Sequence, residues 1–165
     1  MPRTRKSFES GHHRKFLVII DETAECDRAV YYASRRAVRT GGRLVMLAVA
    51  TLRDANQQWL GVGELMRAEA TDEANQRLDH YAARARHVAG IDAERVLREG
   101  NVADEIHKLI EEDPDIGILV LAAGTSNEGP GPLVSSLAGS RSGSFTIPIT
   151  IVPGQLTDEE LDALA

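Results

Sequence analysis

Glycines that follow a strongly apolar stretch are the residues of this chain best suited to bind a ligand. The stretch runs from Leu119 to Ala123, and within the next twenty residues come Gly124, Gly129, Gly131, Gly139 and Gly143. Glycine lets backbone N–H groups approach a ligand closely, and the start of a helix adds partial positive charge. The pattern indicates a phosphate-binding loop, although glycines at this density also serve simply to make turns.

A second group of polar residues follows an earlier apolar run. The run Phe16–Ile20 predicts a strand that is buried on both faces, and it ends at Asp21, Glu22 and Thr23. In open parallel sheets, ligands bind outside the carboxyl ends of the strands, at the point where the strand order reverses. We therefore expect the end of this first strand to face the glycine loop after the fourth.

The elements that must position these groups alternate along the chain. Apolar runs predict strands at 16–20, 43–50, 93–98, 116–123 and 145–152. Apolar stripes at helical spacing predict helices around 29–38 and over 64–89, 102–113 and 133–143, and Thr157 could begin a short final helix. The order predicts an α/β fold: an open, doubly wound, Rossmann-like parallel sheet of five strands with helices on both faces. Pro148 lacks an N–H, which places the last strand at an edge of the sheet.

Composition excludes several classes of protein. The formal net charge of −6 argues against a general nucleic-acid binder, and no apolar run approaches the roughly 20 residues of a membrane span. Cys26 is the single cysteine, which excludes a disulfide framework, and its acidic neighbours Glu25 and Asp27 would raise its pKa and make it unreactive. With no signal-peptide pattern at the start, we expect a soluble cytoplasmic protein with no membrane or nucleic-acid partner.

Three parts of the chain are distinguished by their polarity. Residues 1–14 predict a flexible polar leader, 15–153 the α/β domain, and 154–165 an acidic C-terminal tail with no basic partner nearby. A polar connection at 51–63 contains Trp59 and is long enough to form a flap or a partner surface.

Over roughly residues 15–153, the chain resembles the universal stress protein family. Four segments carry the resemblance: the strand that ends in Asp21 with Thr23 two residues on, 100–106, 115–121 and 147–152. The nucleotide-binding branch of that family carries G-x2-G-x9-G-[S/T] after the fourth strand. Here Gly129 and Gly139 keep the x9 spacing and Ser140 follows, whereas Gly124 precedes Gly129 by x4, so the loop is two residues longer.

The resemblance implies the adenine-nucleotide alpha hydrolase-like form of the fold and a bound ATP or AMP, with Mg²⁺ left open. Adenine would lie near the ends of the first two strands, at Asp21 and at residues 48–50. Phosphates would lie against Gly129, Gly139, Ser140 and Arg141. The whole site implied in this way consists of Asp21, Glu22, Thr23, Val49, Gly124, Gly129, Gly139, Ser140 and Arg141.

The resemblance also implies a homodimer made by pairing the fifth strands, from Ile147 to Val152. The pattern of the chain supports this independently, because an open apolar edge strand is an aggregation risk that a second copy would cover.

Three functions stay open at this point. The first is a nucleotide-binding regulatory dimer. The second is an interaction module without nucleotide, in which the altered loop, the Trp59 connection and the acidic tail serve a protein partner. The third, a slow ATPase or phosphoryl transferase, is distant because the sequence has no P-loop lysine motif and no defined catalytic base. We therefore expect a protein that is not primarily an enzyme.

Overall fold

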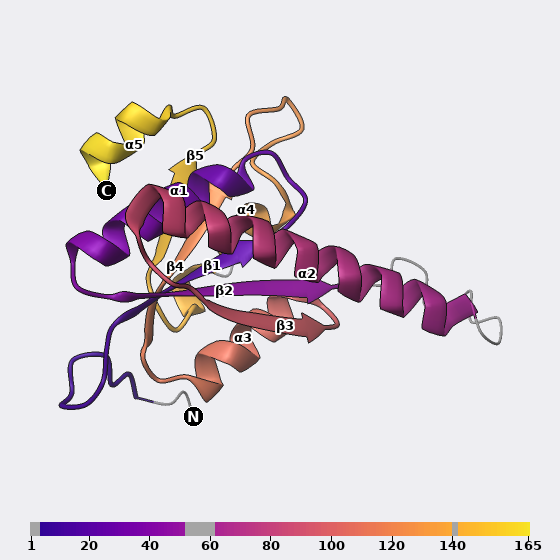
Figure 1. Ribbon diagram of the computed structural model, residues 1–165, viewed down its shortest axis with the longest axis horizontal. Helices are drawn as coiled ribbons and strands as arrows, with labels where there is room; N and C mark the ends of the chain where they lie inside the picture. Colours follow the sequence, from indigo (N-terminus) through magenta and orange to yellow (C-terminus); the bar gives the residue numbers. More distant parts are fainter. Residues whose placement is uncertain (1–3, 52–61, 140–141) are drawn as a thin grey trace.

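The sheet has the topology that the sequence predicts. The structure is a computed structural model, and it describes residues 4–51, 62–139 and 142–165. Its five strands are all parallel and lie in the order β3-β2-β1-β4-β5 (Figure 1). The elements are β1 (Lys15–Ile20), α1 (Cys26–Arg39), β2 (Arg43–Ala50), α2 (Val62–Ala89), β3 (Glu94–Glu99), α3 (Val102–Glu112), β4 (Ile116–Ala123), α4 (Pro132–Leu137), the 3-10 turn η1 (Ser142–Ser144), β5 (Ile149–Pro153) and α5 (Asp158–Leu164).

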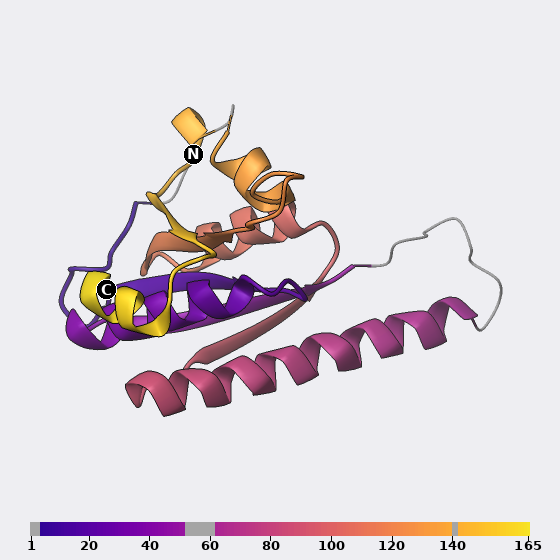
Figure 2. The same cartoon turned by 90° about the horizontal axis from the view of Figure 1, so that it is seen from above.

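Helices cover both faces of the sheet, and Figure 2 shows α2 on the side opposite α3 and α4. Alternate residues of the central strands point to opposite faces, as the strand period of two requires. Phe16 and Val18 of β1 enter a core shared with α1, α2 and α5, whereas Leu17 and Ile19 enter a core shared with α3 and α4. The apolar run of β1 is therefore buried on both faces, as predicted.

The strand order reverses between β1 and β4. The chain passes from β1 to β2 and β3 on one side, and then returns to β4 and β5 on the other. Helices α1 and α4 follow the carboxyl ends of β1 and β4 and pack on opposite faces of the sheet, so the loops after β1 and β4 diverge and leave a crevice at the carboxyl ends of the strands. Helix α2 runs past the same edge, and its first turns project beyond the strand ends (Figure 1).

Two elements near the C-terminus are shorter than predicted. Helix α4 ends at Leu137 instead of continuing to Gly143, because the Gly139 carbonyl accepts hydrogen bonds from the backbone and side chain of Ser142, which closes a tighter turn. Strand β5 begins at Ile149 instead of Phe145. The Pro148 carbonyl accepts from the Leu119 N–H at 3.0 Å, so pairing with β4 starts only there. The edge position that Pro148 predicts for β5 is confirmed.

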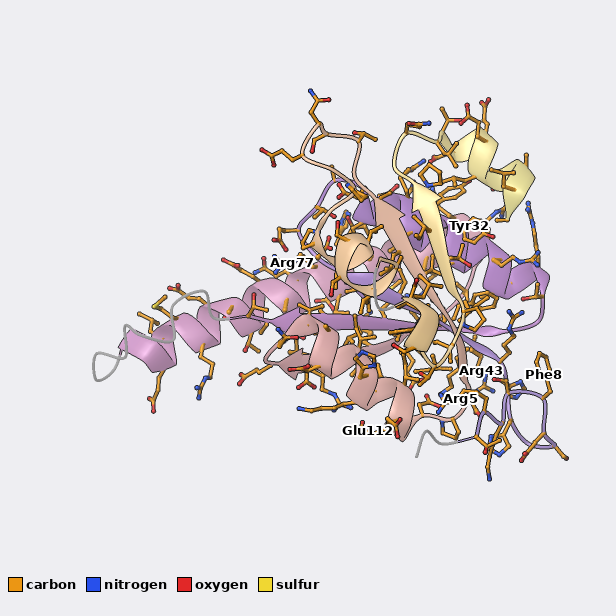
Figure 3. All side chains as sticks on the ribbon, turned by 180° about the vertical axis from the view of Figure 1, so that it is seen from behind. Arg5, Phe8, Tyr32, Arg43, Arg77 and Glu112 are labelled. Carbon is orange, nitrogen blue, oxygen red and sulfur yellow. The ribbon has the colours of Figure 1, made fainter. Side chains whose placement is uncertain are left out.

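The leader differs from the predicted flexible tail. Arg5 donates to the carbonyls of Asp113 and Ile116, at 3.0 and 3.2 Å, and Ser7 donates to the Asp115 carbonyl at 2.8 Å. Phe8 is 89% exposed on the turn that these contacts anchor (Figure 3). The leader is thus attached to the segment that precedes β4.

The acidic tail also has partners, contrary to the prediction. Asp158 pairs with Arg28 at 2.6 Å, and Asp162 pairs with Arg35 at 2.7 Å, so two α5 carboxylates bind arginines of α1. Leu161 is fully buried against the same core. Helix α5 is therefore an integral part of the domain. None of the helices in the described ranges is both long enough and apolar enough to cross a membrane.

Candidate functional site

A cavity of about 520 Å³ lies at the carboxyl ends of β1, β2 and β4, and its volume is typical of small-ligand sites. Its floor is formed by the strand ends, and its walls by α2 on one side and the start of α4 on the other. The lining residues are 19–23 and Glu25 at and after the end of β1, 48–51 at the end of β2, 121–122 in β4, 130–134 around the start of α4, Val102 of α3, and Ala70, Glu73, Ala74 and Arg77 of α2.

Four of the predicted site residues meet in this cavity, namely Asp21, Glu22, Thr23 and Val49. They come from the ends of β1 and β2, which are adjacent and in parallel register, with Ile20 opposite Ala48. The parallel pairing of two consecutive strands is therefore what brings together residues that are nearly thirty positions apart in the sequence.

Asp21 has one carboxylate oxygen engaged and one available. Its Oδ1 accepts from the Thr23 N–H at 2.9 Å and from Thr23 Oγ1 at 2.6 Å. No described residue bonds to Oδ2. Burial raises the pKa of Asp21, the two Thr23 hydrogen bonds oppose that rise, and Glu22 and Glu25 add to it. A ligand N–H or O–H placed at Oδ2 would supply the hydrogen bond that this half-buried carboxylate lacks.

The glycine loop after β4 is arranged differently from the prediction. Gly124 and Gly129 do not line the cavity. Their N–H groups donate within the loop, to Pro130 O at 2.9 Å and to Ser126 O at 3.2 Å, respectively. The N–H groups of both predicted site glycines, of which Gly129 was a predicted phosphate contact, are therefore already used in the loop's own fold, and Pro130 and Pro132 have no N–H to offer.

Gly139 has a packing role at the end of α4 and is not part of the cavity lining. A Cβ at this position would lie 2.3 Å from the carbonyl oxygen of Ser135, a contact that requires the backbone to move. Ser140 and Arg141, the remaining predicted phosphate contacts, lie outside the described residues.

Gly131 is the loop glycine that does line the cavity. It is the N-cap of α4, with φ 106° and ψ 161°, a backbone conformation that residues other than glycine rarely adopt. The backbone conformation of Gly131 therefore sets the direction of the chain into residues 132–134, which form one wall of the cavity.

Comparison with known proteins places this architecture in one family. The model of the universal stress protein family matches residues 12–153, which is most of the chain. The chain belongs to the universal stress protein family. No curated protein sequence matches it.

Solved members of this family share the fold at low sequence identity. Universal stress protein UspA from Lactobacillus plantarum is 19% identical, with a TM-score of 0.67 over 84% of this chain and 97% of that one. The universal stress protein from Archaeoglobus fulgidus in complex with dAMP is 17% identical, with a TM-score of 0.59 over 85% and 98%. A family member from Arabidopsis thaliana with AMP bound is 16% identical, with a TM-score of 0.54 over 88% and 94%.

The cavity of this family member is acidic, with one arginine. Carboxylates come from Asp21, Glu22, Glu25 and Glu73, and the described lining residues contain a single cation, Arg77. Arg77 is not among the site residues predicted from the sequence, because only the apolar residues of α2 carry the signal that predicts this helix. Arg77 follows the stripe residue Ala74 by three positions, and this spacing would have placed it on the cavity side of the helix.

Cys26 contributes to packing rather than to chemistry, as predicted. It is buried under α2, and burial raises the pKa of its thiol to about 12. Within the described ranges, no group of three or more histidine, cysteine, aspartate or glutamate side chains is placed to hold a metal ion.

Proposed function

We propose that this universal stress protein binds an adenine nucleotide in the cavity at the ends of β1, β2 and β4, and acts as a regulatory binding protein. The observation that carries the proposal is the Asp21 carboxylate, which is part-buried in a ligand-sized cavity with Oδ2 unpaired among the described residues. Support comes from family members solved with AMP, with dAMP and, in a third structure, with cAMP.

The lining suggests how the nucleotide would lie. Ala48, Val49 and Ala50 give an apolar floor on which a base can pack, and the adenine amino group or a ribose hydroxyl can donate to Asp21. The phosphates would extend from there along the cavity. A Mg²⁺ ion, if required, would arrive bound to those phosphates.

Calorimetric titration of the full chain with AMP, and with ATP and Mg²⁺, tests the proposal. Asp21→Asn keeps an Oδ1 acceptor for Thr23 but replaces the free acceptor with a donor, so the affinity should fall about tenfold or more. Asp92→Asn is the matched control, because Asp92 is exposed and precedes β3, at the amino ends of the strands and away from the cavity. An absence of saturable heat with every adenine nucleotide would overturn the proposal.

We also propose a homodimer through β5. This strand is hydrogen-bonded to β4 on one side and forms an edge of the sheet, with Ile151 40% exposed. Exposed β-branched side chains on an open edge are suited to pair with a second copy. Light scattering should give twice the 17.9 kDa chain mass, and Ile151→Lys should shift it towards a monomer. A wild-type monomer at high concentration would contradict the dimer.

A protein-interaction module remains the second candidate. The engaged N–H groups of Gly124 and Gly129 favour it, because the loop then offers fewer donors to phosphate. The packing of α5 onto α1 weakens it, since the acidic tail is occupied within the domain. Trp59, the other feature of this hypothesis, lies outside the described residues. Adenine nucleotide recovered from the purified protein would count against this candidate.

A further inference from the structure

Arg77 differs from three other arginines of α2 in having no ion-pair partner among the residues that the structure describes. Arg84 bonds to Asp27 at 3.0 Å, Arg86 to Asp92 at 2.8 Å, and Arg67 lies 3.8 Å from Glu99. The Nε of Arg77 is buried and has no hydrogen-bond partner among the described residues. A buried guanidinium nitrogen in this state is costly, because it has lost water without gaining an acceptor.

The surroundings of Arg77 would ordinarily supply that acceptor. Asp21, Glu25 and Glu73 line the same cavity, yet within the described part of the chain none of them forms an ion pair with Arg77. In Figure 3, Arg77 lies near the strand ends rather than on the projecting turns of α2. The guanidinium thus faces the cavity with donors that the fold leaves unused.

We propose that Arg77 binds the phosphate of the nucleotide, and that it makes this site selective for nucleotides with one phosphate group. The inference rests on the proposed function and deepens it. A guanidinium presents a planar fork of N–H donors that matches two oxygens of one phosphate. The acidic residues of the lining repel further negative charge, and no second cation is found among its described residues.

The charge balance gives the expected ranking of ligands. One arginine can offset about one phosphate group, as in AMP or a cyclic monophosphate. A triphosphate brings extra negative charge into a cavity lined by Asp21, Glu22, Glu25 and Glu73, and repulsion between like charges weakens its binding. Mg²⁺ neutralises part of the charge of ATP, so it should reduce the difference in affinity between ATP and AMP.

The test compares adenosine, AMP and ATP by calorimetry on the full chain, with EDTA and with Mg²⁺. In EDTA, the wild type should bind AMP more tightly than ATP. Arg77→Gln should lower the affinity for AMP about 10- to 100-fold and leave the affinity for adenosine unchanged, because adenosine has no phosphate. Arg86→Gln removes the same charge from the same helix outside the cavity, and it should change neither affinity.

A stability measurement separates this role from a structural one. Arg77→Met keeps the apolar stem and removes the unpaired Nε, so the melting temperature of the ligand-free protein should stay the same or rise. A structural arginine would give a lower melting temperature instead, and so would overturn the inference.

The outcomes distinguish the inference from the proposed function. The inference is wrong, and the proposed function stands, if the wild type binds AMP and Arg77→Gln binds AMP with the same affinity. The same holds if Arg77→Gln loses affinity for adenosine and AMP to the same extent. If the wild type binds ATP more tightly than AMP in EDTA, the selectivity is wrong. If it binds no adenine nucleotide, both fall together.

Discussion

Replacing Gly131 with alanine should destabilise the protein through the backbone alone. With φ 106° and ψ 161°, Gly131 occupies a region that is essentially restricted to glycine. A Cβ built there meets no atom within 4 Å, so the substitution adds no clash. The whole cost is therefore conformational, about 1–3 kcal/mol. For a chain of this size, that corresponds to a fall in melting temperature of about 2–4 °C per kcal/mol.

Urea denaturation of Gly131→Ala beside Gly143→Ala provides the assay. A Cβ at Gly143 also meets nothing within 4 Å, but its φ lies outside the positive range. Gly143→Ala should therefore be neutral or slightly stabilising, because alanine restricts the unfolded chain. Gly131→Ala should also weaken AMP binding, since residues 132–134 form a wall of the cavity. Equal stability of the two variants would refute the argument from backbone conformation.

Three further predictions follow from the packing and the charges. Leu161→Ala should lower the free energy of unfolding by about 2–5 kcal/mol in urea, because Leu161 is fully buried; a loss below about 1 kcal/mol would mean that α5 is not part of the core. Burial would raise the pKa of Asp27, but hydrogen bonds from Arg84 and Arg28 outweigh it and lower that pKa below 3.8. Asp27 therefore stabilises the fold above its ordinary pKa, and this contribution is lost as the pH falls through the lowered value; Asp27→Asn should be less stable than wild type at pH 7, by a margin that shrinks below about pH 4. Cys26 should react with a thiol reagent only after denaturation, and rapid reaction of the native protein would contradict its burial.

The sheet could be predicted from the sequence because its signals are local. The run Phe16–Ile20 has no polar residue, and the structure divides it between the two cores. Thr157, expected as a helix start, forms a capping box with Glu160. The edge position predicted for β5 from Pro148 is confirmed, although Pro148 itself lies just before the strand.

The candidate site was only partly predictable, because its decisive features are tertiary. The sequence shows Asp21 and Val49 at strand ends, and parallel pairing brings them together. It cannot show that the Gly124 N–H is taken by Pro130 O, since that bond depends on how the longer loop closes.

Partners distant in sequence explain the other differences. The acidic tail seemed to lack basic partners because Arg28 is 130 residues from Asp158. The leader looked free because the carbonyls that hold Arg5 lie more than 100 residues further along the chain. Arg77 stands out only when its neighbours are known, because an arginine on a long helix ordinarily points to solvent or pairs with a nearby carboxylate.

The most direct test of nucleotide binding in this cavity is to titrate isotopically labelled full chain with AMP and follow the backbone amide signals by NMR. We predict saturable shifts that cluster at residues 19–23, 48–51, Gly131 and 133–134, with the amide signals of Asp92 and of the amino ends of the strands unchanged. Shifts that do not saturate, or that cluster away from the ends of β1, β2 and β4, would contradict the account.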